Sequence, residues 1–140
     1  MSLQLIEIPG ITAHDQTVWN VRVLQINGKD LVLPDLLKWE KKSQSDHKKI
    51  MKVLKMIGRV DRIRDEKKVK KSKNPKHDGV YEIRADKGHA RVMFFYSRDT
   101  QSAVICTNTY WKSKSSEREQ DADFEYCAKL KEYYEQNTKS

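Results

Sequence analysis

Cysteine is scarce in this chain of 140 residues, which contains only Cys106 and Cys127. Neither cysteine belongs to a CxxC motif or to the cysteine–histidine spacing of a zinc site. The sequence therefore predicts no metal site and no cofactor. Two isolated cysteines favour buried free thiols in a reducing compartment over a disulfide.

Long hydrophobic runs are also missing. A membrane-spanning helix needs about 20 consecutive apolar residues, and no stretch of the chain approaches that length. The first residues include Gln4, Glu7 and Pro9, which do not follow the basic and then apolar order of a secretion signal. We therefore expect a cytoplasmic protein with no membrane contact.

Positive charge is what the chain has in abundance. Charged residues make up 34% of the sequence and the net charge is +8. The excess lies between Lys38 and Lys76, where 16 lysines and arginines stand against 5 acidic residues. This asymmetry predicts an anionic partner, with nucleic acid as the first candidate. A solvated, lysine-rich helix surface is the alternative.

The N-terminal part of the chain predicts β-strands. Alternation of apolar and polar residues indicates strands at residues 3–8 and 18–26. The Asn27-Gly28 pair is typical of a tight hairpin turn, so residues 31–33 should form the return strand.

A helical region is predicted to follow. Apolar residues at helical spacing begin after Pro34 and indicate two helices, whose apolar positions should form a core face and not a ligand site. Ser45 or Asp46 would begin the second helix, and Gly58 would end it. Residues 59–76 then form a basic connector.

Residues 79–112 predict a three-stranded antiparallel meander. Three runs rich in β-branched and aromatic residues are separated by polar breaks at residues 85–88 and 97–101. Gly88 would supply the positive φ of the first turn. A last helix is expected to begin near residue 115, with an acidic first turn that suits the helix dipole.

Alternation along these strands predicts two unlike faces. One face is apolar and must be covered. The other carries Glu82, Arg84 and Arg91 and would present a basic surface to phosphate. A turn at residues 86–88 would place the two arginines side by side on that face.

Three short motifs lie along the meander: Glu82-Ile83-Arg84, Ala90-Arg91-Val92 and Tyr110-Trp111-Lys112. In this order they resemble the RelE/ParE toxin superfamily, nearest to its phage-derived HigB-like branch. The resemblance covers residues 36–134 and implies one α+β domain over residues 1–140, with N-terminal strands, two helices, an antiparallel meander sheet and a C-terminal helix. Residues 1–34 would be an added N-terminal β extension.

The resemblance implies the toxin of a bacterial toxin–antitoxin system. Such a toxin is a metal-independent endoribonuclease that cuts mRNA on the ribosome and is held inactive by a cognate antitoxin. The ribose 2′-OH attacks the adjacent phosphate, and cationic side chains stabilise the charge that builds on the phosphorane. Arg84, Arg91 and Lys112 stand at matching positions and are the candidate catalytic cations. His89 and His77 are the candidates for proton transfer.

RNA-binding candidates come from the connector and from the third strand. Trp111 would stack on a base, and the connector lysines would contact phosphates. These lysines are Lys67, Lys68, Lys70, Lys71, Lys73 and Lys76. Each candidate has a structural alternative: a pair with Glu82 for the arginines, ordinary exposed side chains for the histidines, rim packing for Trp111, and a solvated loop for the lysines.

Two other functions fit the same fold. One is a ParE-like inhibitor of DNA gyrase, which is not a nuclease. The other is a non-catalytic module that binds RNA or protein, because a fold does not fix a function. The basic connector and the Arg84 and Arg91 pair favour the nuclease over the gyrase inhibitor, and the binding module stays open.

Overall fold

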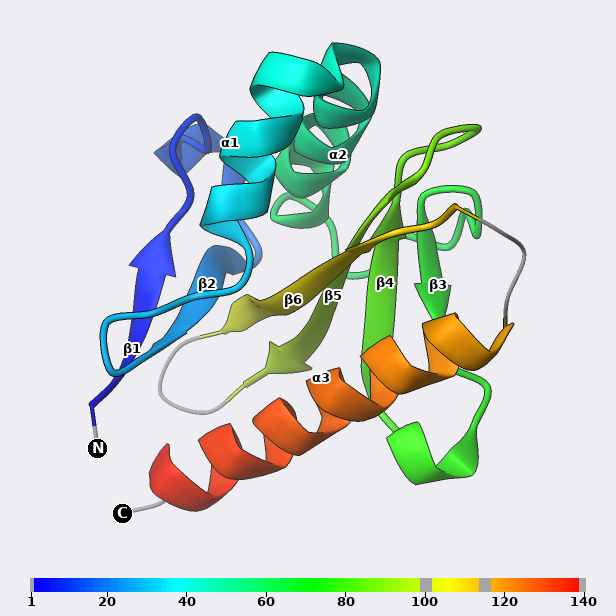
Figure 1. Ribbon diagram of the computed structural model, residues 1–140. Helices are drawn as coiled ribbons and strands as arrows, with labels where there is room; N and C mark the ends of the chain where they lie inside the picture. Colours follow the sequence, from blue (N-terminus) through cyan, green and yellow to red (C-terminus); the bar gives the residue numbers. More distant parts are fainter. Residues whose placement is uncertain (1, 99–101, 114–116, 139–140) are drawn as a thin grey trace.

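The computed structural model describes residues 2–98, 102–113 and 117–138, which form three layers (Figure 1). A six-stranded sheet lies in the middle, with α1 and α2 on one face and α3 across the other. The strands are β1 Leu3–Glu7, β2 Asn20–Ile26, β3 Val69–Lys71, β4 Val80–Arg84, β5 Ala90–Ser97 and β6 Ala103–Trp111. The helices are α1 Leu33–Lys42, α2 Gln44–Ile57 and α3 Glu117–Thr138, with 3-10 turns η1 Ala13–Asp15 and η2 Pro75–His77.

The sheet has the strand order β1-β2-β6-β5-β4-β3, and its only parallel pair among the described strands is β2 with β6. The predicted α+β class is confirmed, and β4, β5 and β6 form the predicted antiparallel meander. The whole sheet is mixed, however, and is not a simple meander. The predicted connector also contributes the edge strand β3, in which Val69 is buried.

The N-terminal hairpin is the clearest error of the sequence prediction. Asn27 and Gly28 do form a tight turn with positive φ values of 54° and 78°. No return strand follows, because the Asp30 carboxylate accepts the N–H groups of Val32 and Leu33 at 2.9 and 2.6 Å, and α1 begins there. The antiparallel partner of β2 is instead β1.

The second predicted helix is confirmed as α2, which ends at Gly58 as expected. Glycine is required there because a Cβ would lie 2.1 Å from the carbonyl oxygen of Asp15. The helix begins at Gln44, slightly earlier than predicted, and Asp46 therefore lies inside its first turn.

Asp46 fastens the turn between β4 and β5. Its carboxylate accepts the backbone N–H groups of His89 and Ala90 at 2.6 and 2.8 Å. The turn itself is where the sequence placed it, but the positive φ of 64° belongs to Lys87 and not to Gly88. Gly88 is needed for a different reason: a Cβ there would lie 2.7 Å from the Asp46 carboxylate.

Both faces of the sheet are covered, so the expectation of one open polar face is wrong. Apolar residues of α1 and α2, such as Trp39 and Leu54, pack on one face, and Phe124, Cys127 and Tyr134 of α3 pack on the other. The two cysteines are buried free thiols, as predicted. None of the described helices is long and apolar enough to span a bilayer.

Candidate nucleic-acid site

A row of paired residues crosses three strands near one end of the sheet. Arg84 of β4 lies opposite Arg91 of β5, which lies opposite Tyr110 of β6. The predicted pairing of the two arginines is therefore confirmed. Residues directly opposite each other share a face, and this row faces the α3 side.

Arg91 is enclosed, with only 5% of its surface exposed. Its Nε lies 3.3 Å from Oε1 of the fully buried Glu82, an ion pair at an angle outside hydrogen-bond geometry. A terminal guanidinium nitrogen donates to the carbonyl oxygens of Gly88 and Ala90 at 3.2 and 2.9 Å. Burial lowers the pKa of Arg91, and the Glu82 charge opposes that shift. This is the arrangement expected of a structural pair.

Glu82 is the centre of a buried polar cluster between the sheet and α3. The Tyr110 hydroxyl donates to Oε1 at 3.3 Å, and the Gln120 amide of α3 donates a short hydrogen bond to Oε2. Burial, followed by the Glu82 charge, raises the pKa of Tyr110. Because α3 supplies one of these donors, the cluster is closed as long as α3 stays in place.

Arg84 has a different environment from its neighbour. It is partly exposed, and its guanidinium donates to the carbonyl oxygen of Glu66 at 3.2 Å. A backbone carbonyl carries no net charge, so the cation is available to an anion. Arg84 is therefore the more accessible of the two predicted arginines.

His89, Trp111 and Lys112 meet beside this row. The Lys112 N–H donates to the His89 carbonyl at 2.8 Å, and the His89 Nδ1 lies 2.6 Å from the Lys112 carbonyl. A carbonyl only accepts, so Nδ1 carries a proton and Nε2 is the basic nitrogen of the neutral ring. The imidazole also stacks on Trp111, with ring centroids 5.0 Å apart and an angle of 23°.

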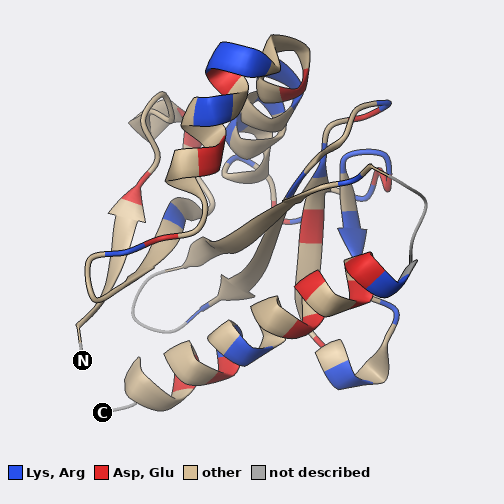
Figure 2. Ribbon diagram, in the orientation of Figure 1, with Lys and Arg blue, Asp and Glu red and all other residues tan. Residues whose placement is uncertain are grey.

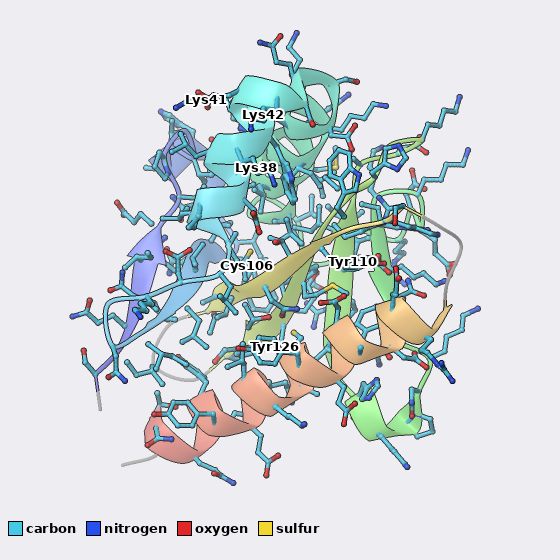
Figure 3. The ribbon with its side chains drawn as sticks, viewed as in Figure 1. Lys38, Lys41, Lys42, Cys106, Tyr110 and Tyr126 are labelled. Carbon is cyan, nitrogen blue, oxygen red and sulfur yellow. The ribbon has the colours of Figure 1, made fainter. Side chains whose placement is uncertain are left out.

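A groove of ≈ 450 Å³ lies between α1 and the end of β6. Trp39 and Trp111 line it, with ring centroids 6.3 Å apart and an angle of 46°. Its cations are Lys38 and Lys42, which Figure 3 labels on α1. Sequence reasoning missed this groove. The four-residue spacing of the two lysines indicates one helix face, but nothing in the sequence places that face beside Trp111.

Other predicted residues lie elsewhere. His77, in η2, is at the opposite end of β4 from Arg84; it is buried, and its Nδ1 has no hydrogen-bond partner among the described residues. A role for His77 in proton transfer stays a prediction. The connector lysines line the β3 edge, where Lys68 pairs with Asp65 at 3.5 Å. The remaining connector lysines that are at least partly exposed are Lys67, Lys70, Lys71, Lys73 and Lys76.

Residues 34–128 match the family model described as Phage derived protein Gp49-like (DUF891). The chain belongs to this family. Gp49-like proteins are part of the RelE/ParE-like toxin set, so the resemblance at the superfamily level is confirmed. A search of curated proteins and a search of solved structures each found no match.

The Gp49-like match contains every residue of the candidate site. It spans α1, α2 and β3 to β6, together with the part of α3 that covers Glu82. It leaves out β1 and β2, which form one side of the sheet. The groove and the arginine row thus both lie within the part of the chain that defines the family.

Proposed function

We propose that this Gp49-like protein is a HigB-like toxin that cleaves mRNA on the ribosome and is held inactive by an antitoxin. The observation that carries the proposal is the meeting of His89, Trp111 and Lys112, of which Trp111 also lines a groove with two lysines. Membership of a toxin-like family supports it. RNA offers what this surface suits, namely unpaired bases and phosphates.

The reaction we propose is an internal transfer at phosphorus. His89 Nε2 removes the proton of the ribose 2′-OH, and the 2′ oxygen forms a bond to the adjacent phosphorus. The bond from phosphorus to the 5′ oxygen breaks, and that oxygen takes a proton from water. The products are a 2′,3′-cyclic phosphate and a 5′-hydroxyl.

Positive charge must stabilise the phosphorane, whose oxygens carry more negative charge than the starting phosphate. Lys112 is our first candidate, because its backbone is hydrogen-bonded to that of His89. Arg84 is the second, because it lies at the same end of the sheet and is partly exposed, although its side chain is on the α3 face. Arg91 could act in this way only if α3 moved and Glu82 released it. With α3 in place, Arg91 instead pairs with Glu82 and holds the carbonyl groups of Gly88 and Ala90.

A non-catalytic RNA-binding module is the second candidate. The buried Arg91–Glu82 pair favours it, because one of the two arginines expected at the phosphate is already neutralised. The groove would then bind RNA without cutting it. Both candidates share the RNA surface, so the test must separate cleavage from binding.

The test combines growth with RNA mapping. We expect expression of the chain alone to arrest bacterial growth, and primer extension on translated transcripts to show new 5′ ends within codons. His89→Gln should lower cleavage by roughly 10²-fold or more if His89 is the base, whereas Lys41→Gln, on the exposed surface of α1, should not.

Three results would count against the proposal in different ways. Unaffected growth with well-expressed protein would overturn the toxin function. Intact mRNA with cleaved DNA would indicate gyrase as the target. Binding of RNA without cleavage would leave the binding module.

A further inference from the structure

The groove between α1 and β6 combines aromatic walls with positive charge. Trp39 and Trp111 give it aromatic walls, and Lys38 and Lys42 give it two ammonium groups. Its one carboxylate, Asp35, accepts a hydrogen bond from the Thr109 hydroxyl at 2.5 Å, which ties it to β6. Two ammonium groups against one carboxylate leave a net positive charge on the described lining of the groove.

We propose that this groove binds one unpaired base of single-stranded RNA and an adjoining phosphate. The base stacks on Trp111, and Lys38 and Lys42 bind the phosphate. This inference rests on the proposed function for its substrate class, but it concerns recognition and not cleavage.

Trp111 is prepared for stacking. It is 41% exposed although it is large and apolar. The His89 ring stacks on the indole, and the nearly buried Trp39 lies beside it at a tilt of 46°, so the indole has two fixed neighbours while part of its surface stays open. An aromatic ring that is already fixed loses little conformational entropy when a base stacks on it. Every base has a π-face, so such a platform tolerates many sequences.

Lys38 and Lys42 suit a phosphate near that base. Residues four apart on a helix lie on the same side, and Figure 3 shows Lys41 displaced around α1 from these two. The volume of ≈ 450 Å³ lies within the range of small-ligand sites, about 300–1,000 Å³. Double-stranded RNA keeps its bases stacked and cannot offer one to the groove.

The experiment measures binding of a short 2′-O-methyl RNA by fluorescence anisotropy. The methyl group blocks the attacking oxygen, so binding is measured even if the protein is a nuclease. We expect Trp111→Leu to weaken binding about 10-fold or more, and Trp111→Tyr to retain most of it. The Lys38→Gln, Lys42→Gln double variant should weaken binding and reduce the salt slope by roughly 0.7 per lost contact.

Lys41→Gln is the matched control, because it removes one lysine from the same helix outside the groove. It should bind like the wild type, and thermal melts should confirm that all variants fold. A single abasic position in the RNA should weaken wild-type binding but not Trp111→Leu binding. Equal binding by all variants, or equal binding of duplex and single strands, would overturn the groove proposal.

The outcomes also separate this inference from the proposed function. If the groove variants bind normally while His89→Gln abolishes cleavage, the nuclease stands and the groove proposal fails. If they lose binding while the wild type shows no cleavage under any condition, the groove proposal stands and the nuclease fails. A wild type that binds no single-stranded RNA overturns both.

Discussion

The two faces of the sheet carry opposite charge. Helices α1 and α2 contain seven lysines and three acidic residues, whereas α3 contains seven acidic residues and three basic ones. Figure 2 shows this contrast on the ribbon. The lysines of α1 and α2 thus make one side of the sheet basic, whereas an acidic helix covers the buried arginine on the other.

This difference separates two uses of cationic side chains. On the α3 side, Arg91 is enclosed with Glu82 and contributes to the fold. On the α1 side, Lys38 and Lys42 are exposed at the rim of a groove. An exposed cation can exchange water for a phosphate at little cost, whereas a buried ion pair must first be broken. The basic side is thus the better candidate for binding nucleic acid.

The largest effect should come from breaking the buried pair. Arg91→Ala leaves the Glu82 carboxylate buried without its cation, and we expect the free energy of unfolding to fall by about 3–5 kcal/mol. Arg84→Ala, at a partly exposed position, should cost about 1 kcal/mol. Urea denaturation of the two variants measures both values.

If Arg91 were a free catalytic cation, Arg91→Ala should not lower the stability of the protein. Two neighbouring guanidinium groups repel each other, so removing one from a free site should leave stability unchanged or raise it slightly. An Arg91→Ala protein that melts like the wild type but no longer cuts RNA would therefore restore Arg91 to the catalytic cations. The comparison of the two faces would then lose its main support.

The arginine register was predictable from sequence, but its environment was not. Alternation and a turn near Gly88 were enough to place Arg84 opposite Arg91, because both depend on residues close in the chain. The covering of that row by α3 depends on a helix that follows about 30 residues later, whose apolar stripe is interrupted by charged residues. Polar residues in a strand thus looked solvent-facing when they were internally paired.

The groove was unpredictable for a related reason. Lys38 and Trp111 are far apart in sequence, and only the packing of α1 on the sheet brings them together. The return strand expected at residues 31–33 was also wrong. The Asn27-Gly28 turn forms as predicted, but Asp30 then starts a helix in place of a strand. The turn was thus predicted correctly but the local signal of Asp30 was missed, and the strand that pairs with β2 is β1, which precedes it in the chain.

The next effect concerns the basic edge of the sheet beside β3. Replacing Lys67, Lys68, Lys70 and Lys71 with Gln should weaken RNA binding about 10-fold and flatten its salt dependence, because each phosphate contact releases counterions. The fold should survive, since Val69 remains as the buried anchor of β3. Salt titrations of the wild type and the variant check this.

The outcome also shows how far the RNA surface extends. An unchanged salt slope would mean that these lysines are only solvated and that the groove acts without them. A steep loss would show that the β3 edge takes part in RNA binding in addition to the groove.

The smallest effect should appear on the acidic side as a pH dependence. Burial, together with the negative charges of Glu119 and Glu82, raises the pKa of Asp123 from 3.8 to about 6. The hydrogen bond from the Asn108 amide opposes this shift. Between these values the folded protein keeps a proton that the unfolded chain releases, so the free energy of unfolding falls as the pH rises. Asp123→Asn removes this dependence.

Near neutral pH the Asp123→Asn variant should be more stable than the wild type, because asparagine has no charge that folding must bury. We expect a difference of only about 1 kcal/mol, because solvent screens a half-buried carboxylate. The difference should vanish near pH 4, where the folded wild type is already neutral at this position. Asp121→Asn makes the same change of charge at an exposed position of α3 and controls for the net charge of the helix. A stability difference that is equal for both variants at every pH would show that the acidity of α3 acts as a whole and that Asp123 has no special contact with the Glu82 cluster.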